Sequence, residues 1–277
     1  MANSVCLRDL QLAELDILIE TIKILKRYNL RYSMIGGTML GAIRHKGFIP
    51  WDDDIDIALP RKDYERFLDI AEKELPKPYA VLRKFGKHEC MYAKIHNTDT
   101  TFIESSTVGW KDYYKGVFID IMPLDGMPSS EKARKKYCKR IGNLVKTFNW
   151  HRFNFKYCKS LKAKLCYLIP EKWIFKKWKK LITKYDFDVS DYTCFAWSHR
   201  PGRLTFQKEL FTNLAKYEFE NIEVCGCQDY DGYLKSHFGT DYMVPPPENK
   251  RGTHNNGNGI VDLNKSYLIY LQEGRQK

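Results

Sequence analysis

Acidic side chains alternate with apolar ones in the segment Asp-Ile-Asp-Ile-Ala-Leu, residues 54–59. Side chains two residues apart on a strand share a face, so Asp54 and Asp56 would point to one side and the isoleucines into a core. Asp52 lies two residues earlier and extends this row, while Asp120 lies between two isoleucines of a second alternating segment. Carboxylates on adjacent strands repel one another, and a hard cation stabilises such a group. A solvated acidic loop is the alternative, but the apolar alternation favours a site for Mg²⁺, or Mn²⁺ in its place.

A second candidate site is the tripeptide Gly36-Gly37-Thr38, between a predicted strand at 30–35 and a helix starting at 39–43. Glycines there let a backbone approach a phosphate group, which the amides of a helix N-terminus can bind. A plain turn is the alternative. The following Arg44-His45-Lys46 carries charges that either contact phosphate or lie at the surface.

The elements that would position these groups can be read from hydrophobic spacing. Residues 7–28 have apolar residues three and four apart and predict a helix that Asn29 ends. Pro60 ends the strand at 54–59, and a helix with Tyr64, Phe67, Leu68 and Ala71 on one face follows it. Further predicted strands lie near 79–85, 91–96, 101–104 and 116–122, the last stopped by Pro123, and predicted helices span 130–149 and 160–185 with a break near Pro170.

Positive charge is concentrated in one part of the 277-residue chain. The net charge is +12, and residues 131–184 contain 18 Lys and Arg but only two acids, so the rest is slightly acidic. Aromatic residues interleave with these lysines. The pattern indicates either a solvated helical face or docking on an anionic membrane or glycan carrier. A nucleic-acid-binding module is supported by charge alone, because no motif accompanies it.

Cysteine content and hydropathy bear on the compartment. The eight cysteines include no CxxC pair, which argues against a zinc site and favours reduced thiols. No run of about 18 apolar residues and no secretory signal is found, so we expect a cytoplasmic protein.

The segment IGGTMLGAIRHKGFIPWDDDIDIALPRKDYERF (35–67) closely resembles the signature of the LicD family. These are phosphotransferases of the nucleotidyltransferase superfamily, related to fukutin and fukutin-related protein. The segments YAKIHNTDTTFIE, GVFIDIMPLDGMP and YDGYLKSHFGTDYMVPPPENKRGTH also look like family blocks. The resemblance covers about residues 10–128 and 228–254, and no family motif covers the basic segment.

The resemblance implies an α/β fold, namely a nucleotidyltransferase core with a short mixed sheet flanked by helices, plus a basic, mainly helical insert. The Gly-Gly-Thr turn would hold donor phosphates. Asp54 and Asp56 would bind Mg²⁺, Asp52 would make the longer pattern of the fukutin branch, and Asp120 would be the third carboxylate. We expect a catalytic core at 1–128, the insert at 129–200, and a return segment at 201–277 that completes the site.

The family's reaction is transfer of phosphocholine from CDP-choline to a sugar of a teichoic acid, lipopolysaccharide or related glycan, at the inner face of the membrane. By this resemblance an acceptor hydroxyl would attack the choline-side phosphorus, with Asp120 as general base and CMP leaving. Transfer of a nucleoside monophosphate from a triphosphate would use the same parts and remains the alternative. A metal-dependent glycosyltransferase also uses paired aspartates, but the Gly-Gly-Thr turn fits it poorly.

Other residues are weaker candidates. A quaternary ammonium is recognised by aromatic faces, and the aromatic residues nearest the carboxylates in sequence are Trp51, Trp110, Tyr113 and Tyr114. Packing is the alternative role for each. Candidates for contact with the donor or acceptor, in family blocks, are Lys94, Arg251 and His254.

Overall fold

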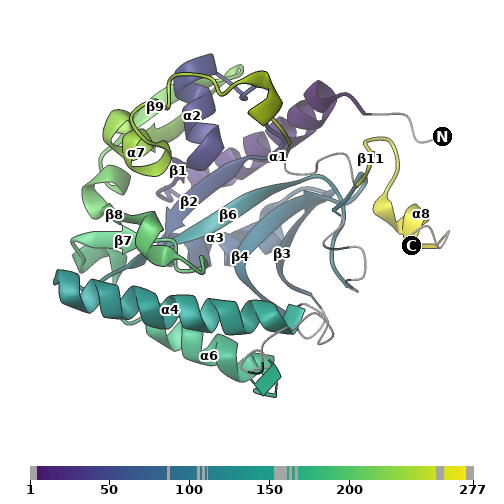
Figure 1. Ribbon diagram of the computed structural model, residues 1–277. Coiled ribbons are helices and arrows are strands. Elements are labelled where there is room, and N and C mark those ends of the chain that lie inside the picture. The colour runs from purple at the N-terminus through teal and green to yellow at the C-terminus, as the bar shows by residue number, and fades with distance from the viewer. Residues whose placement is uncertain are drawn as a thin grey trace.

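The computed structural model describes residues 5–85, 88–104, 107, 110, 112–152, 161, 164–165, 168–253 and 259–272. Its centre is a mixed sheet with the strand order β1-β2-β6-β4-β3 (Figure 1), extended by β7, which pairs with β6, and by β8. Strands β2 and β6 run parallel, whereas the other neighbours run antiparallel. The strands of this sheet are β1 (Ser33–Met34), β2 (Asp56–Pro60), β3 (Tyr79–Phe85), β4 (His88–Asn97), β6 (Phe118–Gly126), β7 (Tyr192–Cys194) and β8 (Thr205–Gln207).

Two helices, α1 (Leu7–Arg27) and α3 (Arg61–Glu74), cover one face of the sheet (Figure 1). Apolar residues recur on one side of each helix, and this stripe packs against the buried strand residues in one large core. None of the described helices covers the middle of the opposite face of β2, β6 and β4, and there the candidate site lies.

A second core lies where α4 (Glu131–Arg152) and α6 (Glu171–Ile182) pack together at one end of the sheet (Figure 1). Trp178 is fully buried there, and its indole N–H donates to the carbonyl of Ala196 at 2.9 Å. The lysines of α6 lie on its outer side. Each basic helix is therefore amphipathic, with the apolar side inward.

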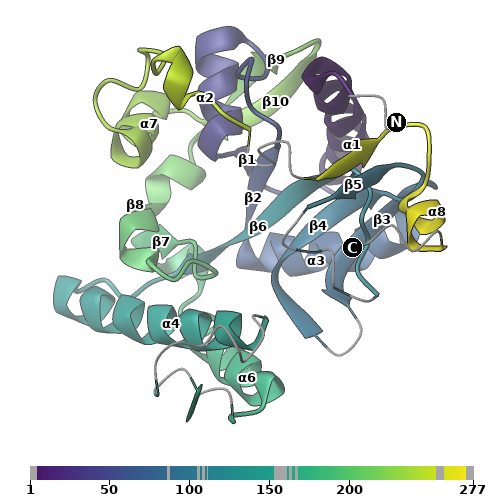
Figure 2. The same ribbon diagram turned by 45° about the vertical axis from the view of Figure 1, so that its right-hand side comes forward.

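At the other end of the sheet, α2 (Gly36–His45) and α7 (Tyr230–Phe238) lie beside the hairpin of β9 (Leu214–Phe219) and β10 (Ile222–Cys227). Strand β11 (Ile260–Asp262) pairs with β5 (Thr101–Ile103) and is followed by α8 (Tyr267–Gln272), as Figure 2 shows. Short 3₁₀ helices are η2 (Phe187–Val189), η3 (Pro201–Leu204), η4 (Lys208–Phe211) and η5 (Glu248–Lys250).

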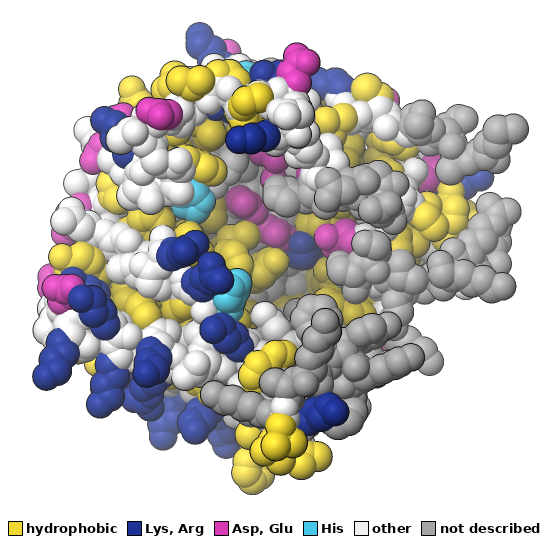
Figure 3. Space-filling view, in the orientation of Figure 1, with side chains coloured by type: hydrophobic (Ala, Val, Ile, Leu, Met, Phe, Trp, Pro, Cys, Tyr) yellow, Lys and Arg dark blue, Asp and Glu magenta, His cyan; other side chains and the backbone are white. Residues whose placement is uncertain are grey.

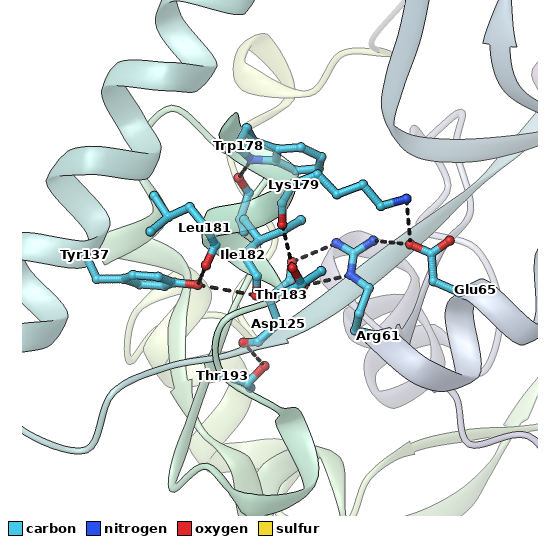
Figure 4. Close-up of polar contacts among 11 residues, drawn as sticks. Arg61, Glu65, Asp125, Tyr137, Trp178, Lys179, Leu181, Ile182, Thr183 and Thr193 are labelled. Atoms are coloured by element: carbon cyan, nitrogen blue, oxygen red, sulfur yellow. Dashed lines mark hydrogen bonds and ion pairs between the residues drawn. The ribbon is translucent and has the colours of Figure 1, made fainter. Parts of the chain in front are cut away.

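A buried ion pair joins the central sheet to the region of α6. Arg61, the first residue of α3, donates two hydrogen bonds to Asp125 near the end of β6, at 2.7 and 2.8 Å (Figure 4). Arg61 also contacts Glu65, which Lys179 of α6 approaches. The Asp125 side chain is fully buried, so this pair is shielded from water. Its geometry is bidentate, which is the strongest arrangement for an arginine and a carboxylate.

The predicted mixed α/β class and the helices at 7–28 and 130–149 are confirmed, with small differences at their ends. The predicted break near Pro170 is also confirmed, because α6 starts directly after this proline. The predicted helix at 160–185 is confirmed over α6, whereas residues 160, 162–163 and 166–167 of it fall outside the described residues, as do Cys158 and Cys166. The six described cysteines are free thiols, as expected.

Three local predictions are wrong. Strand β6 continues through Pro123 to Gly126, because this proline falls between the part of β6 that pairs with β4 and the part that pairs with β7. Helix α2 begins at Gly36 rather than Met39. Strand β2 begins at Asp56, so Asp54 precedes it, and Pro60 is its last residue.

Candidate functional site

Three charged side chains lie in a row across the middle of the sheet. Asp56 on β2 is opposite Asp120 on the parallel strand β6, and Asp120 is opposite Lys94 on β4. The ammonium of Lys94 lies 2.7 Å from Oδ1 of Asp120. Of the predicted site residues, the structure therefore brings these three directly together.

The acidic loop before β2 adds further charge to this row. Asp52 and Asp54 both act electrostatically on Asp56, whose pKa is raised by burial and then by Asp54 and Asp120. Figure 3 shows acidic side chains at the bottom of a hollow in this face of the molecule, with basic side chains beside them. We call the aspartates Asp52, Asp54, Asp56 and Asp120 the acidic row. They form a recessed cluster of negative charge that Lys94 balances in part.

Lys94 remains charged although it is buried. Burial by itself would lower the pKa of its ammonium, but Asp120 and the neighbouring Tyr113 and Glu104 raise this pKa above its usual range. Its Nζ also lies 3.5 Å from the centroid of the Phe118 ring, over its face. This pairing keeps a fixed positive charge next to Asp120.

The two glycines of α2 let the helix start approach the carboxylates. Gly36 has a φ of +55°, which favours glycine, and a Cβ there would lie 3.2 Å from Oδ2 of Asp56. A Cβ at Gly37 would overlap Oδ2 of Asp52. The absence of side chains thus brings the N-terminus of α2, whose amides carry partial positive charge, against the acidic row.

The neighbours of these glycines fix the turn. The hydroxyl of Thr38 accepts a hydrogen bond from the backbone N–H of Asp56 at 2.8 Å. The N–H of Gly36 donates to the hydroxyl of Tyr233, on α7, at 2.8 Å. Thr38 therefore positions an acidic residue, and Tyr233 connects the C-terminal part of the chain to the site.

Glu14 is a site residue that the sequence reasoning missed. It lies on the buried side of α1, and its Oε2 finds no hydrogen-bond partner among the described residues. Burial raises the pKa of Glu14 well above its usual value, and Asp54, Asp53, Asp52 and Asp120 raise it further. It is therefore a fifth carboxyl group close to the predicted ones.

Gln11, one turn before Glu14, holds the acidic loop. Its side-chain amide donates to the carbonyl oxygens of Ile49 at 3.2 Å and Asp52 at 2.9 Å. Gln11 and Glu14 both interrupt the apolar stripe of α1. Because such positions are usually apolar, these two polar residues were the sequence signal that could have pointed to the site.

Two arginines lie at the edge of the site against Trp51. The guanidinium carbons of Arg44 and Arg251 lie 5.8 and 4.4 Å from its ring centroid. Burial lowers the pKa of Arg44, Arg251 lowers it further, and Asp52 opposes this effect. These predicted donor-contacting arginines are thus brought together from distant parts of the chain, whereas His254 lies outside the described residues.

The donor set of the acidic row fits a hard divalent cation by its chemistry. It consists of carboxylate oxygens, and Oδ1 of Asp56 is buried with no hydrogen-bond partner in the described part of the chain. Within that same part, no group of three or more Asp, Glu, His or Cys side chains is arranged around a single point as a formed metal centre. Asp54, Asp56 and Asp120 are the groups that would hold Mg²⁺, with Asp52 beside them.

The four aromatic candidates separate into two locations. Trp110 and Tyr113 line a cavity of about 300 Å³ that also contains Lys94. Trp51 is instead covered by the two arginines, and Tyr114 contacts the ring of His96. Trp110 and Tyr113 therefore share a cavity with Lys94, next to the acidic row.

No helix in the described ranges is both long enough and apolar enough to cross a membrane.

Comparison with known proteins agrees with this arrangement. The family model described as "LicD/FKTN/FKRP, nucleotidyltransferase domain" matches residues 29–167, which include the acidic row and the glycine turn. The chain is 32% identical over 265 residues to the lipopolysaccharide cholinephosphotransferase LicD of Haemophilus influenzae, covering 90% of this chain and 95% of that protein.

Two shorter matches are to uncharacterised proteins of Rickettsia. They are 43% identical over 51 residues in Rickettsia typhi and 46% identical over 44 residues in Rickettsia prowazekii, and each covers 16% of that protein. Because the Haemophilus relative matches over nearly its whole length and the family model spans half of the chain, this protein belongs to the LicD family.

Proposed function

We propose that this protein is a phosphocholine transferase that moves phosphocholine from CDP-choline to a sugar hydroxyl of a cell-surface glycan precursor and releases CMP. The near-full-length similarity to a lipopolysaccharide cholinephosphotransferase carries the proposal. It favours a lipopolysaccharide acceptor, with teichoic acid and capsule as the other glycans to test. The nucleotidyltransferase fold is part of the same proposal and is supported by the matching family model.

The site supports phosphoryl transfer by charge placement. Lys94, beside Asp120, supplies a fixed positive charge for a donor phosphate, and Arg44 and Arg251 supply two more at the edge. Gly36 and Gly37 let the start of α2, whose amides carry partial positive charge, lie close to the carboxylates and so to a phosphate group bound there. Positioning and charge stabilisation provide most of the catalysis in reactions of this kind.

The proposed chemistry is a single displacement at phosphorus. The acceptor oxygen forms a bond to the phosphorus that carries choline, the bond from this phosphorus to the CMP oxygen breaks, and the hydroxyl proton passes to Asp120 as general base. A bound Mg²⁺ would neutralise the charge that spreads over the phosphoryl oxygens. Asp54, Asp56 and Asp120 would hold it, and Asp52 would support them.

The test is an assay with radiolabelled CDP-choline, Mg²⁺ and an undermodified cell-envelope glycan. We expect CMP release and label in the glycan, both abolished by EDTA. CDP-ethanolamine in a parallel reaction ranks the donors. CMP release from CDP-ethanolamine alone would contradict phosphocholine as the transferred group.

The alternative is nucleotidyl transfer, which the description of the matching family model keeps open. It predicts pyrophosphate release from CTP and no CMP from either CDP-alcohol. The same reaction set, with CTP included, therefore separates the two activities.

We further propose that the basic helices dock on an anionic membrane, where a lipid-linked acceptor would be found. Large apolar side chains are exposed beside the lysines near the start of α6, and they are Leu161, Leu165, Leu168, Ile169 and Trp173. Figure 3 shows hydrophobic side chains at the lower edge of the molecule, next to a row of Lys and Arg. Apolar anchors with flanking lysines suit a membrane interface, and each lysine contributes about 1 kcal/mol near an anionic surface.

Co-sedimentation with vesicles tests this docking. We expect binding to phosphatidylglycerol-containing vesicles but not to pure phosphatidylcholine, and release at high salt. The double change Leu168→Ser and Trp173→Ser should reduce binding at least tenfold. Val189→Ser, at an exposed valine outside these helices, is the matched control and should bind as the wild type does. Equal binding by the double variant would contradict the proposal.

A further inference from the structure

Four Tyr and Trp residues, beside polar and aliphatic ones, line the cavity next to the acidic row. Its volume is about 300 Å³, and it is lined by Tyr92, Trp110, Tyr113 and Trp197 together with Lys94 and Glu104. Tyr92 and Trp197 form one pair, with ring centroids 5.1 Å apart, and Trp110 and Tyr113 form another at 5.2 Å. This volume is at the lower end of the range for small-molecule pockets.

The cavity is connected to the proposed reaction centre through Lys94. This residue lines the cavity, and its ammonium contacts Asp120. A phosphate near Lys94 would therefore lie at the boundary between the acidic row and the aromatic cavity. The substituent on that phosphate would enter the cavity.

The electrostatics of the cavity favour a cation. Aromatic faces attract cations through their negative quadrupole. Glu104 adds a carboxylate to the lining, and Lys94, which Asp120 contacts, lies at one side of it. The ammonium of Lys94 itself lies against the face of Phe118 and near Tyr92, so aromatic faces already hold a cation at this boundary.

Tyr113 keeps its hydroxyl protonated in this setting. Burial raises the pKa of Tyr113 above its usual value, and Lys94 only partly opposes this. Its ring therefore stays neutral.

We infer that this cavity is the subsite for the quaternary ammonium of the donor, with Tyr92, Trp197, Trp110 and Tyr113 around the trimethylammonium group and Glu104 as its counter-charge. This inference rests on the proposed function, because it assigns the choline end of the donor. It places the choline phosphorus beside Lys94.

Calorimetric binding of two small probes tests the subsite directly. Phosphocholine carries the cation, and 3,3-dimethylbutyl phosphate has the same shape without the charge. We expect the wild type to bind phosphocholine about tenfold or more tightly than the neutral probe. Equal affinity for the two probes would overturn the inference.

Variants locate the effect in the cavity. Trp197→Leu and Glu104→Gln should each weaken phosphocholine binding about tenfold and leave binding of the neutral probe unchanged, and Trp197→Phe should recover most of the loss. Phe238→Leu, an aromatic-to-leucine change at an exposed residue outside the cavity, is the control. Folded variants with unaltered preference for phosphocholine would place the ammonium elsewhere.

The transfer assay separates failure of the subsite from failure of the proposed function. If phosphocholine is transferred but both cavity variants keep the wild-type KM for CDP-choline, the subsite is wrong and the function stands. If no CDP-alcohol is used but the wild type still prefers phosphocholine over the neutral probe, the function is wrong and the subsite stands.

Discussion

Glu14 is the residue at which the electrostatics of the site can be tested most simply. It is buried beside several carboxylates, and burial and these neighbours raise its pKa. A carboxyl group whose pKa is higher in the folded state binds its proton more tightly there. It therefore contributes stability that is present below its unfolded pKa, near 4.5, and is lost as the pH rises.

Replacing Glu14 by Gln should remove the loss of stability that accompanies ionisation of Glu14 at higher pH. In EDTA at pH 8 we expect Glu14→Gln to melt above the wild type by about 2–4 °C or more, because one pKa unit corresponds to about 1.4 kcal/mol. The difference should shrink as the pH approaches 4.5. Thermal melts over this pH range measure it. An equal or lower melting temperature of Glu14→Gln at pH 8 would show that the Glu14 carboxylate does not destabilise the folded protein.

The sequence pointed to most of the acidic residues of the site, but it did not reveal which of them lie next to one another in the fold. Asp56 and Asp120 were recognised from apolar alternation, yet their pairing depends on β2 lying beside β6, more than 50 residues later. Lys94 was found only by resemblance, because a lysine in a strand has no local signal that it will face a carboxylate. Glu14 was missed because its partners come from the loop before β2 and from β6.

At the scale of elements, the contact between α2 and the acidic loop depends on small side chains. Gly37 lies where a Cβ would overlap the carboxylate of Asp52, whereas a Cβ at Gly202 would meet only Cys138 at 3.9 Å. Gly37 and Gly202 therefore form a matched pair. Alanine at Gly37 tests whether the close approach of α2 to Asp52 matters, and alanine at Gly202 is the control.

Gly37→Ala should lower transferase activity at least tenfold with little loss of stability, because alanine favours helix but displaces Asp52. Gly202→Ala should keep both activity and melting temperature. Initial rates and thermal melts of the two variants measure these effects. Full activity in Gly37→Ala would mean that the position of Asp52 does not matter.

The Arg61–Asp125 pair in Figure 4 predicts a strong dependence of stability on one ion pair. Arg61→Met would leave a fully buried carboxylate without its partner, and we expect a loss of about 3–5 kcal/mol in the free energy of unfolding. Adding Asp125→Asn should recover part of it. Urea unfolding provides the measurement.

Arg83→Met is the matched control for this pair. Arg83 contacts Asp69 and Glu72 at the surface, so its loss should cost less than about 1 kcal/mol. Similar losses for Arg61→Met and Arg83→Met would show that burial does not govern the strength of these ion pairs.

Helix and strand types followed from hydrophobic spacing, but some boundaries did not. Helix α2 starts at Gly36 because the glycine adopts a positive φ there, a freedom that spacing does not reveal. Strand β6 passes Pro123 because its neighbours change at that point. Both errors come from tertiary context.

At the scale of the whole molecule, the C-terminal part of the chain returns to the site. Tyr233 contacts the start of α2, and Arg251 covers Trp51. The sequence predicted that residues 201–277 complete the site, and these two contacts support that proposal. Neither contact could be derived from local pattern, because both join segments about 200 residues apart.

If the acidic row carries phosphocholine transfer, removing one of its carboxylates should abolish the activity and leave the fold intact. Label transfer from CDP-choline to glycan should be measured for the wild type, Asp56→Asn and the control Asp99→Asn, an exposed residue outside the site, with thermal melts alongside. We predict that Asp56→Asn loses at least a hundredfold in activity while its melting temperature is unchanged or higher, since a buried, repelled charge is removed. Equal rates of phosphocholine transfer by Asp56→Asn and Asp99→Asn would show that the acidic row does not carry the reaction.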